Sequence, residues 1–350
     1  SIQHVKGLDI AAFEQTHANN QPITSIRIHP AKAEKNNQLL QNFGASITKV
    51  PWCNHGFYLP QRPSFTLDPL FHAGAYYVQE ASSMFLQQII QQIFTQNTAC
   101  KVLDVCAAPG GKSTLLASYF TNGLVVSNEV IKTRAAILTE NCIKWGTGNM
   151  VVTNNDPKDF SALQEFFNLL VVDAPCSGSG MFRKDATAVE EWSLDNVALC
   201  SQRQRRILAD VLPSLQENGV LIYSTCSYSQ EENEDMIDWM MEELDVETIQ
   251  IKLDENWGIV ETQSDKKNGF GYRFYPNKLK GEGFFIAALR KRSGEGELRL
   301  KLKTIAQPNK QELQVVENHI KKEDFDFFKH ENEIRTISIN WLNELKILAN

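Results

Sequence analysis

Residues 101–114, KVLDVCAAPGGKST, decide the fold of this 350-residue chain. A short apolar run carries an acidic residue, Asp104, near its end, and the adjacent glycines Gly110 and Gly111 precede a segment with helical periodicity. This order predicts a strand, a tight turn and a helix, which together open the βαβ unit of nucleotide-binding folds. Glycines let the backbone approach a ligand closely, and the start of the following helix offers free N–H groups.

The glycine turn admits three interpretations. The dinucleotide fingerprint GxGxxG is absent, because residues 106–111 read CAAPGG. The phosphate-binding loop GxxxxGK[ST] is matched at its end by residues 111–113, but Cys106 occupies the position of the first glycine, which helps to form the phosphate cradle. The third interpretation is a fold that binds S-adenosylmethionine (SAM), in which the turn packs against the methionine end of a cofactor without phosphate. We expect the third, because polar or reactive residues also follow the other predicted strands.

Strand and helix patterns alternate through the middle of the chain. The predicted strands are residues 101–105, 124–128, 149–153, 168–173, 219–225, 246–251 and 283–290. Helices fill most of the gaps, and an amphipathic helix is expected over 77–94. This alternation predicts an α/β fold with a seven-stranded, mostly parallel, doubly wound sheet and helices on both faces. The last two strands are expected to form an edge hairpin across the glycine- and lysine-rich stretch 266–283.

The segments outside this alternating region are less regular. Residues 10–13 predict a helical start, and TSIRIH at 24–29 alternates apolar and polar residues as a strand does. Residues 50–69 combine four prolines with aromatic side chains, which excludes a long helix and favours a packed lid or connector. After residue 291 the polar run RSGEGE predicts a linker, and the pattern of residues 309–350 predicts amphipathic helices.

Composition limits the classes of function. Hydrophobic residues make up 42% and charged residues 22% of the chain, which is ordinary for a globular protein. No apolar run approaches the roughly 18 residues that a membrane span needs, and the first residues lack the layout of a secretory signal. Seven cysteines without a CxxC pair predict reduced thiols in the cytoplasm and no structural zinc site.

The net charge of −7 is unevenly distributed. Residues 231–247 hold nine carboxylates and no Lys or Arg, so the rest of the chain is slightly positive. Basic residues cluster at Arg203, Arg205 and Arg206 and again at 290–292, and such a cluster is as often a solvated face as a binding surface. Charge therefore neither requires nor excludes RNA as a partner.

Polar or reactive residues follow five successive predicted strands. Residues 106–112 follow the first strand, and Glu129 follows the second, 19 residues beyond the first glycine of the turn, where an acid commonly binds ribose hydroxyls. Asp156 follows the third strand and is expected to reach an adenine amino group. Residues 173–180, DAPCSGSG, follow the fourth strand, and residues 224–229, STCSYS, follow the fifth. Because ligands of open α/β sheets bind at the carboxyl ends of the strands, we expect these groups to share one site.

Two cysteines, Cys176 and Cys226, lie at this predicted rim. A single Cys at a strand end is usually a small buried hydrophobe. These two follow adjacent predicted strands and have Ser, Gly and Thr neighbours. A structural disulfide is the alternative, and a reducing compartment disfavours it. We therefore expect a pair of reactive thiols beside the cofactor.

A thiol at this rim suits methyl transfer to carbon 5 of a pyrimidine. That carbon is a poor nucleophile until a thiolate adds to C6 and pushes electron density onto C5. A cation such as Lys112 would raise the thiolate fraction, and Asp173 would bind the N3–N4 edge of the base and balance the charge that develops on the ring. Methylation of an amino nitrogen is the alternative. It needs no thiol, and its sites typically present Asn/Asp-Pro-Pro-aromatic, whereas residues 173–176 read DAPC.

The motifs DVCAAPGGK at 104–112, DAPCSGSG at 173–180 and STCSYSQEENE at 224–234 resemble those of the Sun/RsmF family of RNA cytosine-5 methyltransferases. YYVQEASS at 76–83 and GFFIAALRK at 283–291 are similar to the same family's pattern. The resemblance implies a Rossmann-like, SAM-dependent methyltransferase fold. It also implies an enzyme that makes 5-methylcytosine in RNA.

The resemblance assigns roles to matching positions of this sequence. Cys226 would be the nucleophile, Cys176 would assist proton removal and product release, and Asp173 and Lys112 would contact the target base. No metal ligand is implied. The implied cofactor-binding residues are Cys106, Ala107, Ala108, Pro109, Gly110, Gly111, Lys112, Glu129, Arg134, Asp156 and Asp173.

Residues 50–84 are similar to the bacterial RsmF branch of the family, which acts on small-subunit ribosomal RNA. The implied partner is RNA, either 16S rRNA or the assembling 30S subunit, with a monomeric, cytoplasmic enzyme. Transfer RNA stays the alternative substrate, because only the branch resemblance favours ribosomal RNA.

We expect four parts along the chain. They are an N-terminal α+β domain that binds RNA or acts as a lid, a methyltransferase domain, a linker and a C-terminal helical extension, at residues 1–75, 76–291, 292–308 and 309–350. Members of this branch usually carry a PUA-like RNA-binding module after the core. The extension is therefore expected to be the start of such a module or a reduced form of it.

Overall fold

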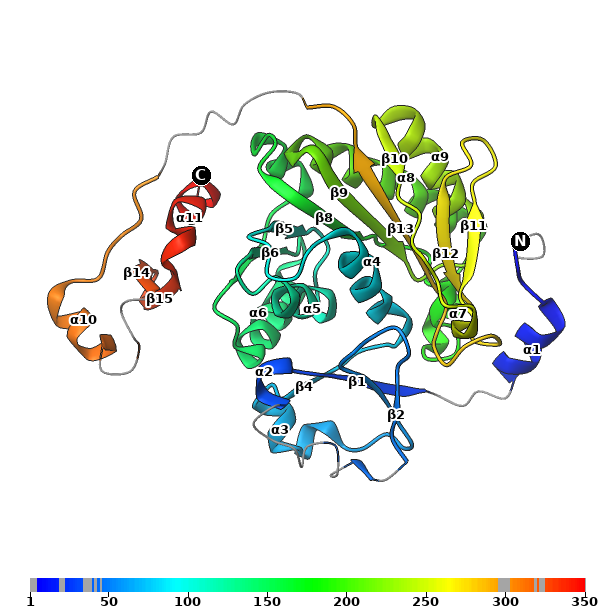
Figure 1. Cartoon of the computed structure of the whole chain (residues 1–350), viewed down its shortest axis with the longest axis horizontal. Coiled ribbons are helices and arrows are strands. Elements are labelled where there is room, and N and C mark those ends of the chain that lie inside the picture. The colour runs from blue at the N-terminus through cyan, green and yellow to red at the C-terminus, as the bar shows by residue number, and fades with distance from the viewer. Residues whose placement is uncertain are drawn as a thin grey trace.

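The computed structural model describes residues 5–18, 23–33, 40, 43–44, 46–294, 303–317, 320 and 325–349. Within them, a central nine-stranded sheet carries helices on both faces, and a four-stranded sheet built from the N-terminal part lies at one end of it (Figure 1). No described helix combines the length and the apolar character that crossing a membrane requires.

The parallel half of the central sheet has the predicted doubly wound order. Its strands are β5 (Lys101–Asp104), β6 (Leu124–Asn128), β7 (Met150–Thr153), β8 (Phe167–Asp173) and β9 (Leu215–Thr225). They lie in the order β7-β6-β5-β8-β9, and each neighbouring pair is parallel. The chain therefore winds outward from β5 to β7 and then returns to the other side of β5. This reversal leaves a crevice beyond the carboxyl ends of β5 and β8.

The other half of the sheet is antiparallel and larger than expected. β13 (Phe284–Lys291) pairs antiparallel with β9 and with β10 (Val246–Thr248), and the strands β11 (Val260–Gln263) and β12 (Phe270–Phe274) extend the edge. The predicted hairpin from the last two strands is thus incomplete, because β12 lies inside the glycine-rich stretch. A Cβ atom at Gly271 would come within 2.6 Å of the Phe285 ring. The glycine that suggested a loop is there because a neighbouring strand packs closely.

Alternate residues of the strands point to opposite faces of the sheet. In β8, Leu169 and Val171 join the apolar core beneath α4 (Leu86–Ile93) and α5 (Gly111–Tyr119). Leu170 and Val172 join the core beneath α8 (Leu194–Val211) and α9 (Glu234–Glu243). The remaining central helices are α6 (Lys132–Trp145) and α7 (Ala186–Glu191). Burial on both faces explains why these strands read as continuous apolar runs.

The N-terminal sheet has the order β2-β3-β1-β4 and is antiparallel throughout. Its strands are β1 (Thr24–Ile28), β2 (Thr48–Lys49), β3 (Gly56–Leu59) and β4 (Tyr76–Val78), and α2 (Pro30–Ala33) and α3 (Pro69–His72) accompany them. The first helix, α1 (Ile10–Ala18), packs instead on the central domain through Phe13 and Tyr228 (Figure 1). The helix predicted over 77–94 is wrong in its first part, because Tyr77 pairs with Arg27 across β4 and β1. A short 3-10 turn at Ser82–Phe85 leads into α4, where the apolar periodicity is found.

The C-terminal part is not wholly helical. It contains α10 (Lys310–Glu317), a two-stranded antiparallel sheet of β14 (Phe325–His330) and β15 (Glu333–Ser338), and α11 (Leu342–Leu348). The predicted helical extension is therefore wrong over 325–338, where alternating apolar residues form a hairpin whose turn residue Glu331 has a φ of 53°. Phe327, Ile337 and Trp341 are buried. Residues 295–302 of the predicted linker lie outside the described residues.

Candidate active site

The predicted site residues meet where β5, β6, β8 and β9 end. The thiols of Cys176, after β8, and Cys226, after β9, lie with their Sγ atoms 3.0 Å apart. The amide of Cys226 also donates to the Cys176 sulfur at 3.3 Å. All seven cysteines are free thiols, as the sequence predicts. The two cysteines are therefore placed so that both can act on one substrate atom pair.

The environment of Cys176 disfavours its thiolate. The hydrogen bond with Cys226, burial, and the nearby negative charges of Cys226 and Glu232 all raise the pKa of the Cys176 thiol. Cys106, in the glycine turn, is likewise kept neutral, because burial and the carboxylates of Asp104, Asp173 and Glu129 raise the pKa of its thiol. Cys176 thus ionises less readily than an ordinary exposed thiol.

Lys112 and Asp173 form an ion pair beside the cysteines. The Nζ atom of Lys112 lies 2.7 Å from Oδ2 of Asp173, while the hydroxyl of Ser224 donates to Oδ1 at 2.7 Å. Lys112 also lies over the ring of Phe284, 5.2 Å from its centre. The structure brings these two predicted base-binding residues together. A direct contact of Lys112 with either thiol is not among the described contacts, so its role in thiolate formation stays a prediction.

One buried carboxylate holds the two cysteine loops, and the sequence did not single it out. Glu232 has no exposed surface and accepts hydrogen bonds from the amide and hydroxyl of Ser177, at 2.8 and 2.5 Å. It also accepts from the hydroxyl of Ser227, at 2.5 Å, and from the amide of Gln204, at 3.1 Å. Ser177 and Ser227 follow Cys176 and Cys226 in the chain. Glu232 therefore fixes the position of one loop relative to the other.

A second set of contacts closes the loops against β13. The amide of Gly180 donates to the carbonyl of Cys226 at 2.8 Å, and the amide of Gly283 donates to the carbonyl of Gly180 at 3.2 Å. A Cβ atom at Gly180 would come within 2.4 Å of the Gly283 carbonyl oxygen, so this close approach requires glycine. Nearby, Arg183 makes a bidentate, buried ion pair with Glu282, with distances of 2.9 and 3.0 Å.

The glycine turn has the geometry expected of a cofactor loop. Gly110 caps α5 with a φ of 111°, a conformation that favours glycine. The turn is held from outside, because Arg134 donates to the carbonyl of Ala108 at 2.9 Å and Tyr77 donates to that of Pro109 at 2.9 Å. The backbone of residues 106–112 is therefore fixed while its inner side faces the strand ends.

Two acidic residues next to the turn retain hydrogen-bonding capacity. Glu129 receives the amide of Ile131 on Oε1 at 3.0 Å, and its Oε2 lies 3.2 Å from Arg134 without a hydrogen bond. Asp104 is fully buried, and its Oδ1 has no hydrogen-bond partner among the described residues. Burial raises the pKa of Asp104 to about 7, against the lowering effects of Ser113 and Lys112. Orphaned buried acceptors fit a ligand that brings hydroxyl or ammonium donors, as SAM does.

Asp156 stands apart from this group. Its carboxylate accepts the amide of Lys158 at 3.1 Å and so caps the short helix at Pro157–Ala162. No hydrogen bond or ion pair joins it to the other predicted site residues in the described part of the chain. Its predicted contact with an adenine group stays a prediction. The described residues also include no cluster of His, Cys, Asp and Glu that could hold a metal ion.

Glu232, Asp104 and the Arg183–Glu282 pair are the site residues that sequence reasoning missed. Glu232 lies within the motif at 224–234, and Glu282 directly precedes the motif at 283–291. Glu232 could not be singled out because it is one of nine carboxylates at 231–247. Glu234 is equally hidden, and in the structure it pairs with the buried Arg273. These acids differ from the exposed ones because they are buried beside hydrogen-bond donors. The number of charges in a segment does not reveal which of them are buried.

Comparisons with known proteins agree with this geometry. Residues 92–290 match the family model described as 16S rRNA methyltransferase RsmB/F, and residues 1–81 match the model for the N-terminal domain of 16S rRNA methyltransferase RsmF. Ribosomal RNA small subunit methyltransferase F of Pectobacterium carotovorum is 35% identical over 278 residues, which cover 76% of this chain and 56% of the relative. The protein of the same name from an Escherichia coli O139:H28 strain is 34% identical over 276 residues, covering 76% and 57%. The chain spans little more than half the length of these relatives.

A solved structure shares the fold. A methyltransferase homologue from Pyrococcus horikoshii superposes with a TM-score of 0.68 and 29% identity, covering 83% of this chain and 93% of that one. The family model alone covers more than half of the chain, including both cysteine loops and the glycine turn. The chain belongs to the RsmB/F family of 16S rRNA methyltransferases.

Proposed function

We propose that this protein is a SAM-dependent RNA cytosine-5 methyltransferase. The observation that carries the proposal is the pair of free thiols, Cys176 and Cys226, 3.0 Å apart beside the Lys112–Asp173 ion pair. Methylation of an amino nitrogen or oxygen needs no thiol, whereas carbon 5 of cytosine becomes nucleophilic only after a thiolate adds to C6. Two thiols at one rim have no comparable use in the alternative chemistry.

The cofactor would bind along the glycine turn. Residues 106–112 and Arg134 form the wall, and Glu129 offers a free carboxylate oxygen for ribose hydroxyls. Asp173 brings a carboxylate to the same crevice, which suits a cationic ligand, and Asp104 offers an oxygen without a described hydrogen-bond partner. When bound there, SAM supplies an electrophilic methyl group to C5 of the base.

The chain's own residues perform the remaining steps. The Cys226 sulfur forms a bond to C6 of the flipped cytosine, and Asp173 accepts a hydrogen bond from the N4 amino group while Lys112 balances its charge. After C5 carries the methyl group, a base takes the C5 proton and the electron pair of that bond re-forms the C5–C6 double bond. The sulfur–C6 bond breaks at the same time, and its electron pair leaves with the Cys226 sulfur as a thiolate. Cys176 lies 3.0 Å from the nucleophile and is placed to assist that step. Removing Cys176 is then expected to preserve bond formation and to block release.

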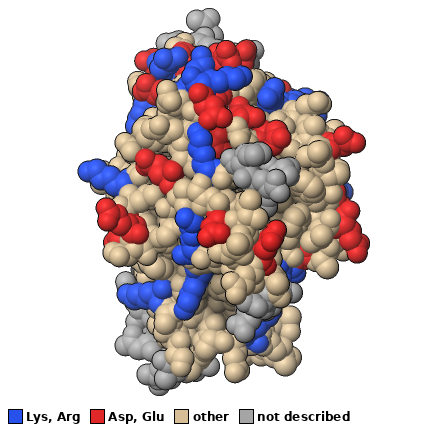
Figure 2. Space-filling view, turned by 90° about the vertical axis from the view of Figure 1, so that its right-hand side faces the viewer, with Lys and Arg blue, Asp and Glu red and all other residues tan. Residues whose placement is uncertain are grey.

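We further propose that the substrate is small-subunit ribosomal RNA and that the enzyme acts in the cytoplasm, where 30S subunits assemble. The family description and the names of the relatives support this choice. A single copy suffices, because both cysteines and the glycine turn come from one chain. On the face shown in Figure 2, acidic and basic side chains are mixed at the top, while the charged side chains in view toward the bottom are basic. That part of the surface suits a polyanion.

Release of tritium from RNA labelled at C5 of cytosine tests the reaction. Cytosine-5 methylation expels the C5 hydrogen, so tritium should appear in water in step with methyl incorporation. Methyl incorporation without tritium release would favour the amino-methylation alternative. Bisulfite sequencing of 16S rRNA and of transfer RNA, with and without the enzyme, then decides between the two substrates.

A further inference from the structure

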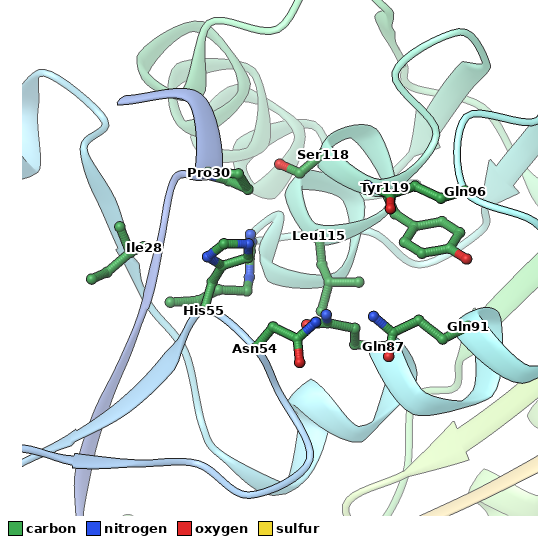
Figure 3. A pocket seen from close by; sticks show the side chains of 11 residues that line it. Ile28, Pro30, Asn54, His55, Gln87, Gln91, Gln96, Leu115, Ser118 and Tyr119 are labelled. Carbon is green, nitrogen blue, oxygen red and sulfur yellow. The ribbon is translucent and has the colours of Figure 1, made fainter. Parts of the chain in front are cut away.

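A cavity between the N-terminal sheet and α5 is not used by the proposed reaction, because its lining includes none of the residues that the reaction uses. It has a volume of about 100 Å³ and lies between the N-terminal sheet, α4 and α5. Figure 3 shows the amide groups of Asn54, Gln87 and Gln91 pointing toward the middle of this space, with the ring of His55 on the N-terminal side. Arg27, from β1, also lines it.

Arg27 is an unusual cation because it is buried without an acid. Its side chain belongs to a residue that is 2% exposed, and it forms no ion pair in the described part of the chain. Its Nε donates to Gln79 at 2.8 Å, and its Nη2 donates to the carbonyl of Gly111 and the hydroxyl of Thr114, at 3.1 and 2.5 Å. The guanidinium lies over the Trp145 ring at 4.6 Å. Its Nη1 makes no hydrogen bond to a described residue.

The described surroundings of Arg27 add positive charge. Among the residues that the structure describes, those lining the cavity include no Asp or Glu. Next to it, the pKa of His29 falls to about 4, because burial and then the positive charges of Lys32, Arg27 and His55 oppose its protonation. Burying a cation without a partner is costly, and the cost is largest where water is excluded. An anion in the cavity would offset that cost.

The cavity also has hydrogen-bond donors to spare. Nη1 of Arg27 is unused, and Gln87 accepts the Cys53 thiol on Oε1 at 3.0 Å, which leaves its amide N–H groups free to donate. Charge-assisted donors of this kind suit the oxygens of a phosphate group. The same guanidinium donates to the Gly111 carbonyl, so an anion bound here would be tied directly to the glycine turn.

We propose that this cavity binds a backbone phosphate of the RNA substrate, away from the methylated cytosine. The inference rests on the proposed function, which makes RNA the polyanion that this enzyme meets. An acidic chain of net charge −7 needs local anchors of positive charge to hold RNA, and an acid-free cavity around Arg27 is one. The phosphate contact would fix the RNA relative to the cofactor turn through Arg27.

Neighbouring glutamines on α4 provide a matched test. Gln91 lines the cavity, whereas Gln92 exchanges hydrogen bonds with the backbone of Lys252, at 2.8 and 3.0 Å. Both are exposed residues of one helix, so Gln91→Glu and Gln92→Glu add the same charge at adjacent positions. Affinity for a 16S rRNA fragment is measured at several salt concentrations. Gln91→Glu should weaken binding about fivefold and reduce the salt dependence, and Gln91→Lys should strengthen binding.

The outcomes separate this site from the proposed function. Equal RNA affinities of the Gln91→Glu and Gln92→Glu variants would overturn the proposal. Inorganic phosphate is titrated in parallel and followed by the NMR signals of the His55 ring. A response to phosphate without an effect of the Gln91 variants on RNA would mean a site for a small free anion, and would also overturn it. Tritium release by the unmodified protein on the same RNA shows independently whether the methyltransferase assignment holds.

Discussion

The carboxylate of Glu232 accepts hydrogen bonds from both the backbone amide and the side-chain hydroxyl of Ser177, at 2.8 and 2.5 Å. Through the hydroxyl of Ser227, at 2.5 Å, the same carboxylate reaches the second cysteine loop. One buried acid thus sets the separation of the two thiols. The two cysteine loops are held together by a residue that the sequence shows only as one of nine carboxylates.

Replacing Glu232 should impair chemistry more than binding. Glu232→Gln keeps the shape of the side chain but removes its negative charge and turns one acceptor oxygen into a donor, so the charge-assisted hydrogen bonds from Ser177 and Ser227 are weakened or reversed. A thiol displaced by a fraction of an ångström to 1 Å should lower kcat by about 10- to 100-fold, with little change in KM for RNA or SAM. Steady-state tritium release gives both constants.

Glu234→Gln is the matched control for this variant. Glu234 is also buried in the same stretch, but it pairs with Arg273 and Thr262 and forms no hydrogen bond with Ser177 or Ser227 in the described part of the chain. It should lower thermal stability while leaving kcat near that of the unmodified enzyme. Equal losses of kcat in both variants would mean that Glu232 has only a general structural role.

Asp104 should make stability depend on pH. Its pKa of about 7 lies above the ordinary value of 3.8, because burial disfavours the charged carboxylate. Between these values the folded protein keeps a proton that the unfolded chain has released, so the free energy of unfolding should fall as pH rises through that window. The contribution of one such group approaches about 1.4 kcal/mol per pH unit.

Urea unfolding from about pH 5 to about pH 8 measures this slope in the absence of cofactor. In Asp104→Asn, the part of the pH dependence of the unfolding free energy that Asp104 causes should disappear. Relative to the unmodified protein, this variant should therefore gain stability as the pH approaches 8. If the variant and the unmodified protein lose stability in parallel, Asp104 does not hold its proton as the geometry indicates.

Replacing one partner of the buried ion pair of Arg183 and Glu282 should destabilise the folded protein. Glu282→Gln leaves the guanidinium buried without a charge partner, which typically costs about 3–5 kcal/mol. The double replacement Arg183→Met with Glu282→Leu should recover part of that loss, because neither charge is then left unpaired. Thermal unfolding of Arg183→Met, of Glu282→Leu and of the variant that carries both measures the coupling. Additive losses would show that the two side chains do not depend on each other.

Gly180 should tolerate no side chain. A Cβ atom there would lie 2.4 Å from the carbonyl oxygen of Gly283 and 2.8 Å from that of Cys226, and both are backbone atoms. Gly180→Ala must therefore move the Cys226 loop, and we expect a large loss of kcat with SAM binding retained. Calorimetric titration with SAM alongside the activity assay separates the two effects. Full activity in this variant would contradict the close packing of the loops.

The parallel core could be predicted from the sequence because its strands are buried on both faces. β6 occupies residues 124–128 as predicted, since the apolar run and the strand coincide when no solvent-facing residue interrupts the pattern. The strand ends then placed Cys176, Cys226, Lys112 and Asp173 at one rim, because parallel strands end on the same side of a sheet. The grouping of these four residues could therefore be predicted from the order and direction of the strands.

The remaining features depend on contacts between distant segments. Tyr76–Val78 reads as the start of an amphipathic helix, but pairing with β1 makes it a strand. Gly271 lies in a glycine-rich stretch that is typical of a loop. In the structure it belongs to a strand, and the ring of Phe285 occupies the space that a side chain would need. Glu232 cannot be distinguished from the eight neighbouring carboxylates in the sequence, because its contact with Ser177 joins distant segments of the chain. Local patterns carry no record of such long-range partners.

Trapping a covalent protein–RNA complex tests the two-thiol mechanism most directly. RNA containing the target cytosine is incubated with SAM and each variant, and the products are separated on a denaturing gel. Cys176→Ala should accumulate a slowly migrating adduct, because Cys226 still bonds to C6 and release is blocked, whereas Cys226→Ala and the double variant should form none. An adduct or methylated RNA produced by Cys226→Ala would contradict the assignment of Cys226 as the nucleophile, and the central claim would fall with it.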